Sequence, residues 1–314
     1  MLENETILVE DRYSTGADII ELVEHLFSKP QTKASYQERK QYEAIYRKCA
    51  LQIIVPIQNH KVALEGSREI GFLAELYPEE KDFYLPLLNV QELHSAWYIY
   101  QEGIHMPVLG YKIHPFWSTY VPKRREHLEL FATWLRTFPA TSKTVIDVGT
   151  GTGILSLMMQ KYGFSKITST DNNPNSIVSL HRELSRHPEF TNIHPLHTDL
   201  IKNTEKADLI VCNPPWIPGL PDEGFDEALY FDPKGDFFSR FFTQAYEHLN
   251  PKGSLVILFS NIMTLLRPDI VHPITKELSQ TRFRCIEKHQ RRVKPQNPQK
   301  RTQEKVELWI LQKQ

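Results

Sequence analysis

Cysteine is scarce in this chain. Its 314 residues include Cys49, Cys212 and Cys285, and no two of them stand in a C-x-x-C spacing. Zinc sites and disulfide frameworks both use cysteines in closely spaced groups. The sequence therefore predicts neither a metal site nor a disulfide framework.

Targeting signals, membrane spans and an excess charge are missing as well. Residues 1–6 are acidic and lack the basic-then-apolar order of a signal peptide. No apolar run approaches the ~20 residues that cross a bilayer. The formal net charge of -1 excludes a globally basic nucleic-acid binder, although it allows a local basic patch. We expect a soluble, cytoplasmic protein that does not enter a membrane.

What the chain does have is room for two domains. Its 40% hydrophobic and 24% charged residues are typical of a globular protein, and a chain of this length buries roughly 75% of its unfolded surface. We expect a mixed α+β module over 1–112 and a second domain over 113–314. In the first module, spacing predicts a hairpin (52–57 with 61–65) and helices over 17–27, 34–51 and 90–101. No motif there names a substrate, and we assign it substrate recognition as a hypothesis.

The segment 113–130 joins the two parts. Its first half is aromatic without periodicity, and a helix is predicted from Lys123, with Pro122 as its start signal. The segment is either a linker helix packed on the sheet or a lid whose aromatic side chains wall a ligand pocket. Both interpretations stay open.

The second domain begins with an apolar strand that leads into a glycine turn. Residues 144–153 read Thr-Val-Ile-Asp-Val-Gly-Thr-Gly-Thr-Gly, and a helix is predicted over 154–162. A strand, a glycine turn and a helix together bring backbone N–H groups up to a polar ligand. The G-x-G-x-G spacing differs from the G-x-G-x-x-G of dinucleotide sites, so we expect a nucleoside-bearing ligand of another kind.

Strands and helices then alternate, which predicts an α/β fold with a mostly parallel sheet covered on both faces. The chain ends differently, because 282–287 and 306–311 have no helix between them and are expected to pair antiparallel. The expected strands are 144–147, 166–170, 192–197, 207–212 and 254–259, and the expected helices are 172–186 and 237–249.

Polar residues follow four successive strands, at the sheet edge where such folds bind ligands. They are Asp147, Asp171, Asp199 and Asn213. Asp171 comes about twenty residues after Gly151, the separation at which an acid reaches a ribose diol. Asp199 is a candidate acceptor for an exocyclic amine. Asp147 is a candidate for orienting an ammonium group through water or backbone.

The motif Asn213-Pro-Pro-Trp216 indicates the chemistry. Prolines donate no hydrogen bond, so this turn offers two acceptors, the Asn213 side-chain oxygen and the Pro214 carbonyl. Two fixed acceptors suit the two hydrogens of a planar NH2 group, whose lone pair then points out of the plane. Trp216 offers a flat face for stacking. Alignment, rather than acid–base chemistry, would supply most of the rate.

These motifs together resemble the class I S-adenosylmethionine-dependent methyltransferases of the amino-methylating kind, which share a Rossmann-like seven-stranded sheet. The resemblance covers about 113–314. Within it, 121–128 is similar to the equivalent segment of release-factor glutamine methyltransferases and of small-domain ribosomal RNA guanine methyltransferases. Relatives often have Tyr where this chain has Trp216, which keeps stacking and drops the hydroxyl.

The resemblance implies a site for S-adenosyl-L-methionine and a site for the target nitrogen. Asn213, Pro214 and Trp216 are the candidate catalytic residues, and no metal is implied. The candidate cofactor residues are Asp147, Gly149, Thr150, Gly151, Asp171, Asn172, Asp199 and Asn213.

The acceptor is open between RNA, a translation-related protein and a small planar amine or amide. A basic segment, 288–305, has seven Lys or Arg and one acid, and it is either a phosphate-tracking surface or a solvated loop. The acids of 217–235 are either solvated or placed where they would repel a phosphate backbone. The remaining alternative, a dinucleotide-dependent oxidoreductase or a non-catalytic binding module, leaves the Asn-Pro-Pro-Trp motif unexplained.

Overall fold

The computed structural model divides the chain into two compact units, Met1–Glu102 and Gly103–Gln314. Among the residues that it describes, no helix combines the length and the apolar character needed to cross a membrane. The described residues are 5–27, 36–122, 124–138, 143–219, 228–294 and 303–314.

The division falls earlier than the 112/113 boundary expected from the sequence. The cause is an unpredicted antiparallel hairpin of β5 (Ile104–Met106) with β6 (Tyr111–Ile113). Its residues Met106 and Ile113 are buried in the core of the second unit, beside the helices that cover the large sheet. The hairpin is therefore part of the second unit.

The first unit has a small sheet centred on β2 (Ile53–Gln58). The predicted hairpin is confirmed, and its turn residues Asn59 and His60 have φ values of 48° and 58°. Positive φ at both central residues is what a type I′ turn requires. The other strands of this sheet are β1 (Ile7–Leu8), which pairs with β2 in parallel, and β3 (Lys61–Val62) and β4 (Phe83–Pro86), which pair with it antiparallel.

Aromatic rings pack together inside this unit. The rings of Trp97 and Tyr100 lie 4.9 and 5.2 Å from that of Phe72, which is fully buried. Trp97 and Tyr100 therefore pack against the core of this unit, whereas Tyr98 is exposed. The helices of the unit are α1 (Tyr13–Leu26), α2 (Tyr36–Ala50), α3 (Leu73–Leu76) and α4 (Leu87–Glu102), and the three predicted ones are among them.

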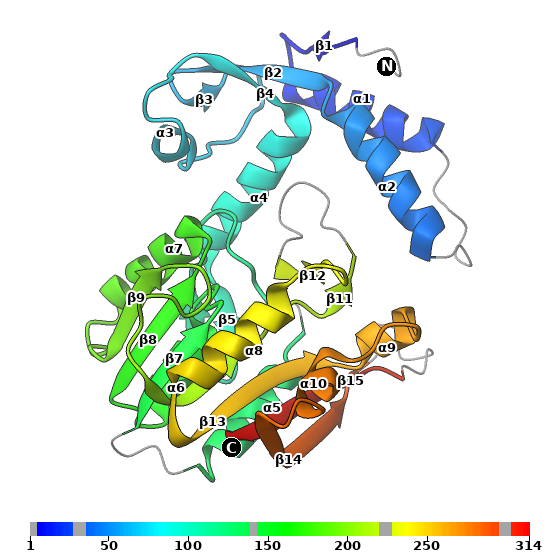
Figure 1. Ribbon diagram of the computed structural model, residues 1–314. Coiled ribbons are helices and arrows are strands. Elements are labelled where there is room, and N and C mark those ends of the chain that lie inside the picture. The colour runs from blue at the N-terminus through cyan, green and yellow to red at the C-terminus, as the bar shows by residue number, and fades with distance from the viewer. Residues whose placement is uncertain (1–4, 28–35, 123, 139–142, 220–227, 295–302) are drawn as a thin grey trace. The chain divides into compact units, whose positions relative to one another are not determined.

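The second unit is built on a seven-stranded sheet in the order β14-β15-β13-β10-β7-β8-β9 (Figure 1). The sheet is parallel except for β15, which runs antiparallel to both of its neighbours. The predicted fold and its C-terminal hairpin are confirmed. The strands are β7 (Thr144–Val148), β8 (Lys166–Asp171), β9 (Ile193–His197), β10 (Ala207–Cys212), β13 (Leu249–Ser260), β14 (Phe283–Arg292) and β15 (Lys305–Lys313).

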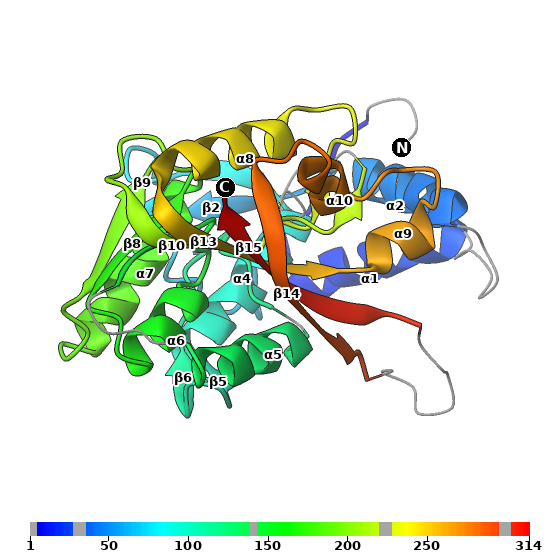
Figure 2. The same ribbon diagram turned by 60° about the horizontal axis from the view of Figure 1, so that its bottom comes forward.

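Two hydrophobic clusters cover the two faces of this sheet. Alternate residues of β7 divide between them, with Val145 in one and Ile146 in the other, because successive strand side chains point to opposite faces. Figure 2 shows α8 (Phe237–His248) on one side and α5 (Glu126–Leu135) with α6 (Ile154–Lys161) on the other. The remaining helices are α7 (Pro174–Arg186), α9 (Ile262–Leu266) and α10 (Pro273–Leu278).

Candidate active site

The glycine turn connects β7 to α6 at the carboxyl edge of the sheet. Gly149, Gly151 and Gly153 have φ values of 68°, 52° and 78°, a region that side chains with a Cβ rarely adopt. Gly153 also has no room for a side chain, since a Cβ there would lie 2.4 Å from Leu180 Cδ1 of α7. The turn therefore needs glycine for its backbone and, at Gly153, for its packing.

Asp147 lies beneath this turn and is fully buried. Its Oδ2 accepts hydrogen bonds from Thr150 Oγ1 at 2.8 Å and from Ser156 Oγ at 2.6 Å. Burial raises the pKa of Asp147 to about 6, against the lowering effect of these two hydrogen bonds. The side chain thus braces the turn from inside and does not line the cavity described below.

Asp171 joins the glycine turn to the turn after β8. Its Oδ2 accepts from the Gly151 backbone N–H and its Oδ1 from that of Asn173, both at 2.8 Å. Burial raises the pKa of Asp171, while these hydrogen bonds act to lower it. A side-chain hydrogen bond from Ser176 also acts to lower this pKa. Asp171 lines the cavity described below.

Asp199 follows β9 and is bound by cations. Its Oδ2 lies 2.6 Å from Arg240 Nη1 and 3.3 Å from Lys202 Nζ. Partial burial acts to raise the pKa of Asp199, but the hydrogen bonds from Arg240 and Lys202 lower it overall. The carboxylate is thus held in its ionised form.

The motif after β10 separates into two parts. Asn213 and Pro214 line the cavity, and the buried Asn213 Oδ1 has no hydrogen-bond donor among the described residues. Trp216 does not line it. Its indole Nε1 donates to the Leu258 carbonyl of β13 at 3.2 Å, and its ring meets the His127 ring edge-on at 5.1 Å. The structure therefore places Trp216 behind the turn rather than on its ligand face.

The loop before α5 is anchored to α7. Its backbone N–H groups at His114 and Phe116 donate to the side chains of Glu183 and Ser179. The Ser118 carbonyl accepts from Asn173 Nδ2 at 2.7 Å. Ser118, Tyr120 and Pro122 line the cavity, and α5 begins at Glu126 rather than at Lys123, which lies outside the described residues. The loop forms a wall of the cavity in this anchored position.

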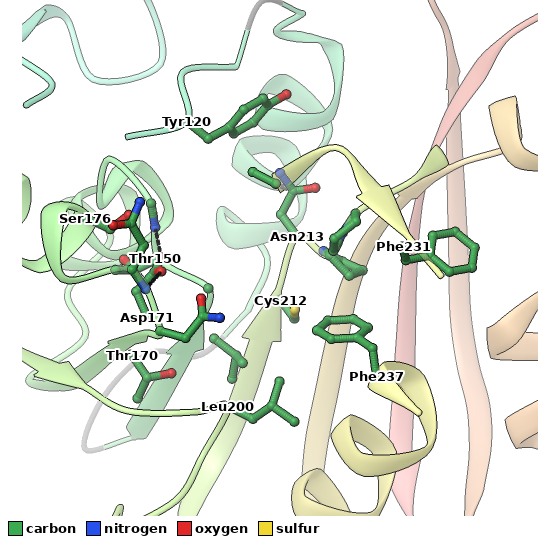
Figure 3. Close-up of a pocket in the computed structure, with 18 of the residues that line it drawn as sticks. Tyr120, Thr150, Thr170, Asp171, Ser176, Leu200, Cys212, Asn213, Phe231 and Phe237 are labelled. Carbon is green, nitrogen blue, oxygen red and sulfur yellow. Dashed lines mark hydrogen bonds between the residues drawn. The ribbon is translucent and has the colours of Figure 1, made fainter. Parts of the chain in front are cut away.

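These elements enclose a cavity of about 440 Å³. Figure 3 shows Thr150 and Asp171 on one side of it, Phe231 and Phe237 on the other, and Asn213 between them. The predicted site residues that line the cavity are Gly149, Thr150, Gly151, Asp171, Asn172, Asp199, Asn213 and Pro214. Asp147 and Trp216 do not line it, for the reasons given above.

Several residues of the cavity wall were not predicted from the sequence. Phe231 comes from the segment after the Asn-Pro-Pro-Trp turn, in which only the acids were noted, and Phe237 and Arg240 come from the predicted helix that follows it. β11 (Ile217–Pro218) pairs with β12 (Tyr230–Phe231) and so brings this segment back to the cavity. The sequence around these two strands contains no local pattern that predicts their pairing. Of the acids, Asp232 lines the cavity, while those at 222, 223, 226 and 227 lie outside the described residues.

The basic segment 288–305 is partly engaged in internal contacts. Lys288 lies 3.7 Å from the Trp309 ring centre and 3.1 Å from Glu307, and Arg291 pairs with Glu129 at 2.5 Å. Lys300 and Arg301 lie outside the described residues, while Arg292 and Lys294 are exposed. Two basic side chains of this segment, Lys288 and Arg291, therefore pair with carboxylates of the second unit.

The sheet order, the glycine turn and the polar strand ends define an α/β domain of the class that binds ligands at the carboxyl edge of its sheet. Residues 129–282 match the family described as the methyltransferase small domain. Just under half of the chain thus resembles this family, in agreement with the motifs.

Curated relatives match parts of the same domain. The chain is 34% identical over 127 residues to a protein provisionally named a protein N5-glutamine methyltransferase of Methanocaldococcus jannaschii, across 38% of this chain and 64% of that one. It is 37% identical over 79 residues to a tRNA1(Val) (adenine(37)-N6)-methyltransferase of Vibrio vulnificus, across 24% and 33%. It is 34% identical over 86 residues to a ribosomal protein L11 methyltransferase of Hydrogenovibrio crunogenus, across 27% and 28%. The matches thus span less than two thirds of these relatives' lengths.

Proposed function

We propose that the protein is an S-adenosylmethionine-dependent methyltransferase that methylates a planar amino or amide nitrogen of RNA or of a translation-related protein. The proposal rests mainly on the side chain of Asn213. Its Oδ1 is buried at the cavity wall without a donor among the described residues. A buried acceptor of this kind is costly unless a partner arrives, so it points to a ligand that donates an N–H.

The cavity fits the proposed cofactor through its donor and acceptor groups. Asp171 lines the cavity, where its carboxylate suits the hydroxyls of a ribose, and Asn172 lies next to it on the wall. Asp199 is ionised and suits an exocyclic amine. Asp147 contributes indirectly, because its hydrogen bonds with Thr150 and Ser156 hold the glycine turn in place. The cofactor, when bound, supplies an electrophilic methyl group.

The acceptor side is built to hold and align an NH2 group. Asn213 Oδ1 and the Pro214 carbonyl accept its two hydrogens, which keeps the nitrogen lone pair free and directed out of the plane. The rings of Phe231 and Phe237 stand at this side of the cavity and offer apolar faces (Figure 3). Trp216 supports the turn from behind through its bond to Leu258. Orientation is then the main source of rate.

Replacing Asn213 tests the proposal most directly. Asn213→Ala removes one of two acceptors that act on the reacting nitrogen, so we expect kcat to fall by ~10²–10³-fold. Affinity for S-adenosylmethionine, measured by calorimetry, should change less than about threefold. Asn172→Ala is the reciprocal control, because it should weaken cofactor binding and leave kcat at saturating cofactor nearly intact. Equal losses of binding and turnover in Asn213→Ala would contradict the role given to Asn213.

The identity of the bound ligand distinguishes the proposed function from the oxidoreductase alternative. We expect calorimetry to show binding of S-adenosylmethionine and none of NAD, in agreement with the glycine spacing. Binding of NAD alone would overturn the proposed function.

A labelling experiment in cell extract tests the chemical class of the methyl acceptor. The three relatives are named for acting on glutamine, on tRNA adenine and on a ribosomal protein, which supports an acceptor in the translation machinery and a cytoplasmic site of action. Transfer of a labelled methyl group, followed by separation of RNA, protein and small molecules, identifies the class. Label confined to small molecules would contradict our choice of acceptor.

A further inference from the structure

Arg240 stands out among the cavity residues because it bridges two carboxylates. It lies in the first turn of α8, and its Nη1 is 2.6 Å from Asp199 Oδ2. Its Nε donates to Asp236 Oδ1 at 3.1 Å, just before the helix begins. These contacts of Nη1 and Nε therefore hold the planar guanidinium group in one orientation.

The loop after β9 is attached to α8 at two successive turns. Arg240 binds the Asp199 side chain, and Gln244 Oε1, one turn further on, accepts from the Ile201 backbone N–H at 3.1 Å. The helix itself is fixed in the core by the buried rings of Phe241 and Phe242. The Asp199 carboxylate is thus held by a packed helix in addition to Lys202 of its own loop.

The bonds to Asp199 use only one of its two oxygens. Arg240 and Lys202 both approach Oδ2, and no donor among the described residues contacts Oδ1. An ionised carboxylate accepts hydrogen bonds and donates none. The remaining oxygen therefore accepts an amine and disfavours a carbonyl oxygen at the same place.

We propose that Arg240 is a positioning residue that aims Asp199 Oδ1 at the exocyclic amine of the cofactor's base, so that the enzyme selects adenine over a base with a carbonyl there. This inference rests on the proposed function. It assigns to α8 a part in reading the base, which the glycine turn and the Asn-Pro-Pro-Trp turn do not supply.

The effect of Arg240 on recognition is separable from its effect on folding. The side chains of Arg240 and Asp199 are 40% and 37% exposed, and exposed ion pairs contribute little to stability. Arg240→Gln is therefore expected to fold, with a Tm close to that of the unaltered protein. Its consequence should appear in the choice between ligands.

The experiment compares two ligands that differ at the base. S-adenosylhomocysteine has the exocyclic amine, and S-inosylhomocysteine has a carbonyl oxygen instead. Calorimetry on the full chain should give at least a tenfold preference for the adenosyl ligand, as expected for a hydrogen bond to a charged group. In Arg240→Gln, the Kd of the adenosyl ligand should rise about tenfold while that of the inosyl ligand changes less than twofold.

Two further variants complete the test. Arg240→Lys keeps the charge and loses the fork, so it should restore part of the preference. Arg267→Gln removes a similar exposed pair, the 2.6 Å contact of Arg267 with Asp269, away from the cavity. It should leave both Kd values unchanged.

The outcomes separate this inference from the proposed function. Binding of neither ligand by the unaltered protein would contradict the proposed function. If the unaltered protein prefers the adenosyl ligand and Arg240→Gln retains that preference, the inference about Arg240 is wrong. Equal weakening of both ligands in Arg240→Gln would also overturn it, since that is the result of a general support for the cavity.

Discussion

A fully buried carboxylate at Asp147 is costly in its charged form, and the structure shows what the chain gains from it. The two hydroxyls of Thr150 and Ser156 bind the same oxygen and so fix the glycine turn to the first turn of α6. The other oxygen, Oδ1, has no partner among the described residues. The raised pKa of about 6 expresses this incomplete compensation.

This raised pKa makes stability depend on pH. Because the folded protein binds the Asp147 proton more tightly than the unfolded chain, the contribution of this group to stability is greatest below 3.8, the ordinary pKa of an aspartate side chain, and declines as the pH rises to about 6. The decline from this group is roughly 3 kcal/mol, at 1.36 kcal/mol for each pKa unit. Asp147→Asn carries no charge at any pH, so its stability should lack this contribution.

Urea unfolding at pH values from 4 to 7 measures the effect. The difference in unfolding free energy between Asp147→Asn and the unaltered protein should shift in favour of the variant as the pH rises through that range. A difference that stays constant with pH would show that Asp147 titrates normally.

Trp216 supports the Asn-Pro-Pro-Trp turn from the side that faces away from the cavity. Its ring packs against both hydrophobic clusters of the second unit, and its N–H satisfies a backbone carbonyl of β13. The neighbouring His127 is buried with a pKa lowered to about 4 by that burial, so it faces the indole as a neutral ring. Stacking against a ligand falls instead to rings that line the cavity.

Among the helices and strands, α6 has the strictest requirement for one residue type at its start, which is the glycine at position 153. Gly153 combines a φ of 78° with a Cβ position 2.4 Å from Leu180 Cδ1. Gly163, at the other end of the helix, has a φ of 91° and open space around its Cβ position. The two glycines thus differ in packing and share the backbone conformation.

Replacing each glycine by alanine separates the two effects. Gly163→Ala should cost about 1–2 kcal/mol for the left-handed backbone. Gly153→Ala should cost about 2–5 kcal/mol, because the displacement of Leu180 adds about 1–3 kcal/mol. Denaturant unfolding of both variants provides the comparison. Equal losses would mean that α7 moves aside without cost.

Element positions were largely predictable because their signals are local. The strand at 144–148, the helix that follows it and the end of β10 at Cys212 appear in the structure where the sequence placed them. The β5–β6 hairpin and the β11–β12 pair were missed, since strands of two or three residues contain too few positions for a period-two pattern.

For the molecule as a whole, the division at Glu102 and Gly103 has a functional counterpart. Every residue of the cavity lies in the second unit. The first unit has its own sheet and its own buried residues, including Ile53, Val55 and Phe72. We therefore keep acceptor recognition as the hypothesis for the first unit and cofactor binding as that for the second.

A truncated chain tests this division of labour. Residues 103–314 should bind S-adenosylmethionine with a Kd within about threefold of the full chain, because they contain the entire cavity. Methylation of the acceptor identified in extract should fall by at least tenfold through a higher KM. Circular dichroism checks that the fragment is folded. Full activity of a folded fragment would exclude a role of the first unit in acceptor recognition.

The sequence alone determined the order of strands and helices, the glycine turn and the acceptor turn at Asn213, because each depends on residues close together in the chain. Only the tertiary structure decided which side chains face the cavity. Asp147 and Trp216 turn inward, where Ser156 and the Leu258 carbonyl are their hydrogen-bond partners. Arg240 joins the site because α8 packs beside β13 and reaches the loop after β9. Such partners lie far apart in sequence, where no local spacing specifies them.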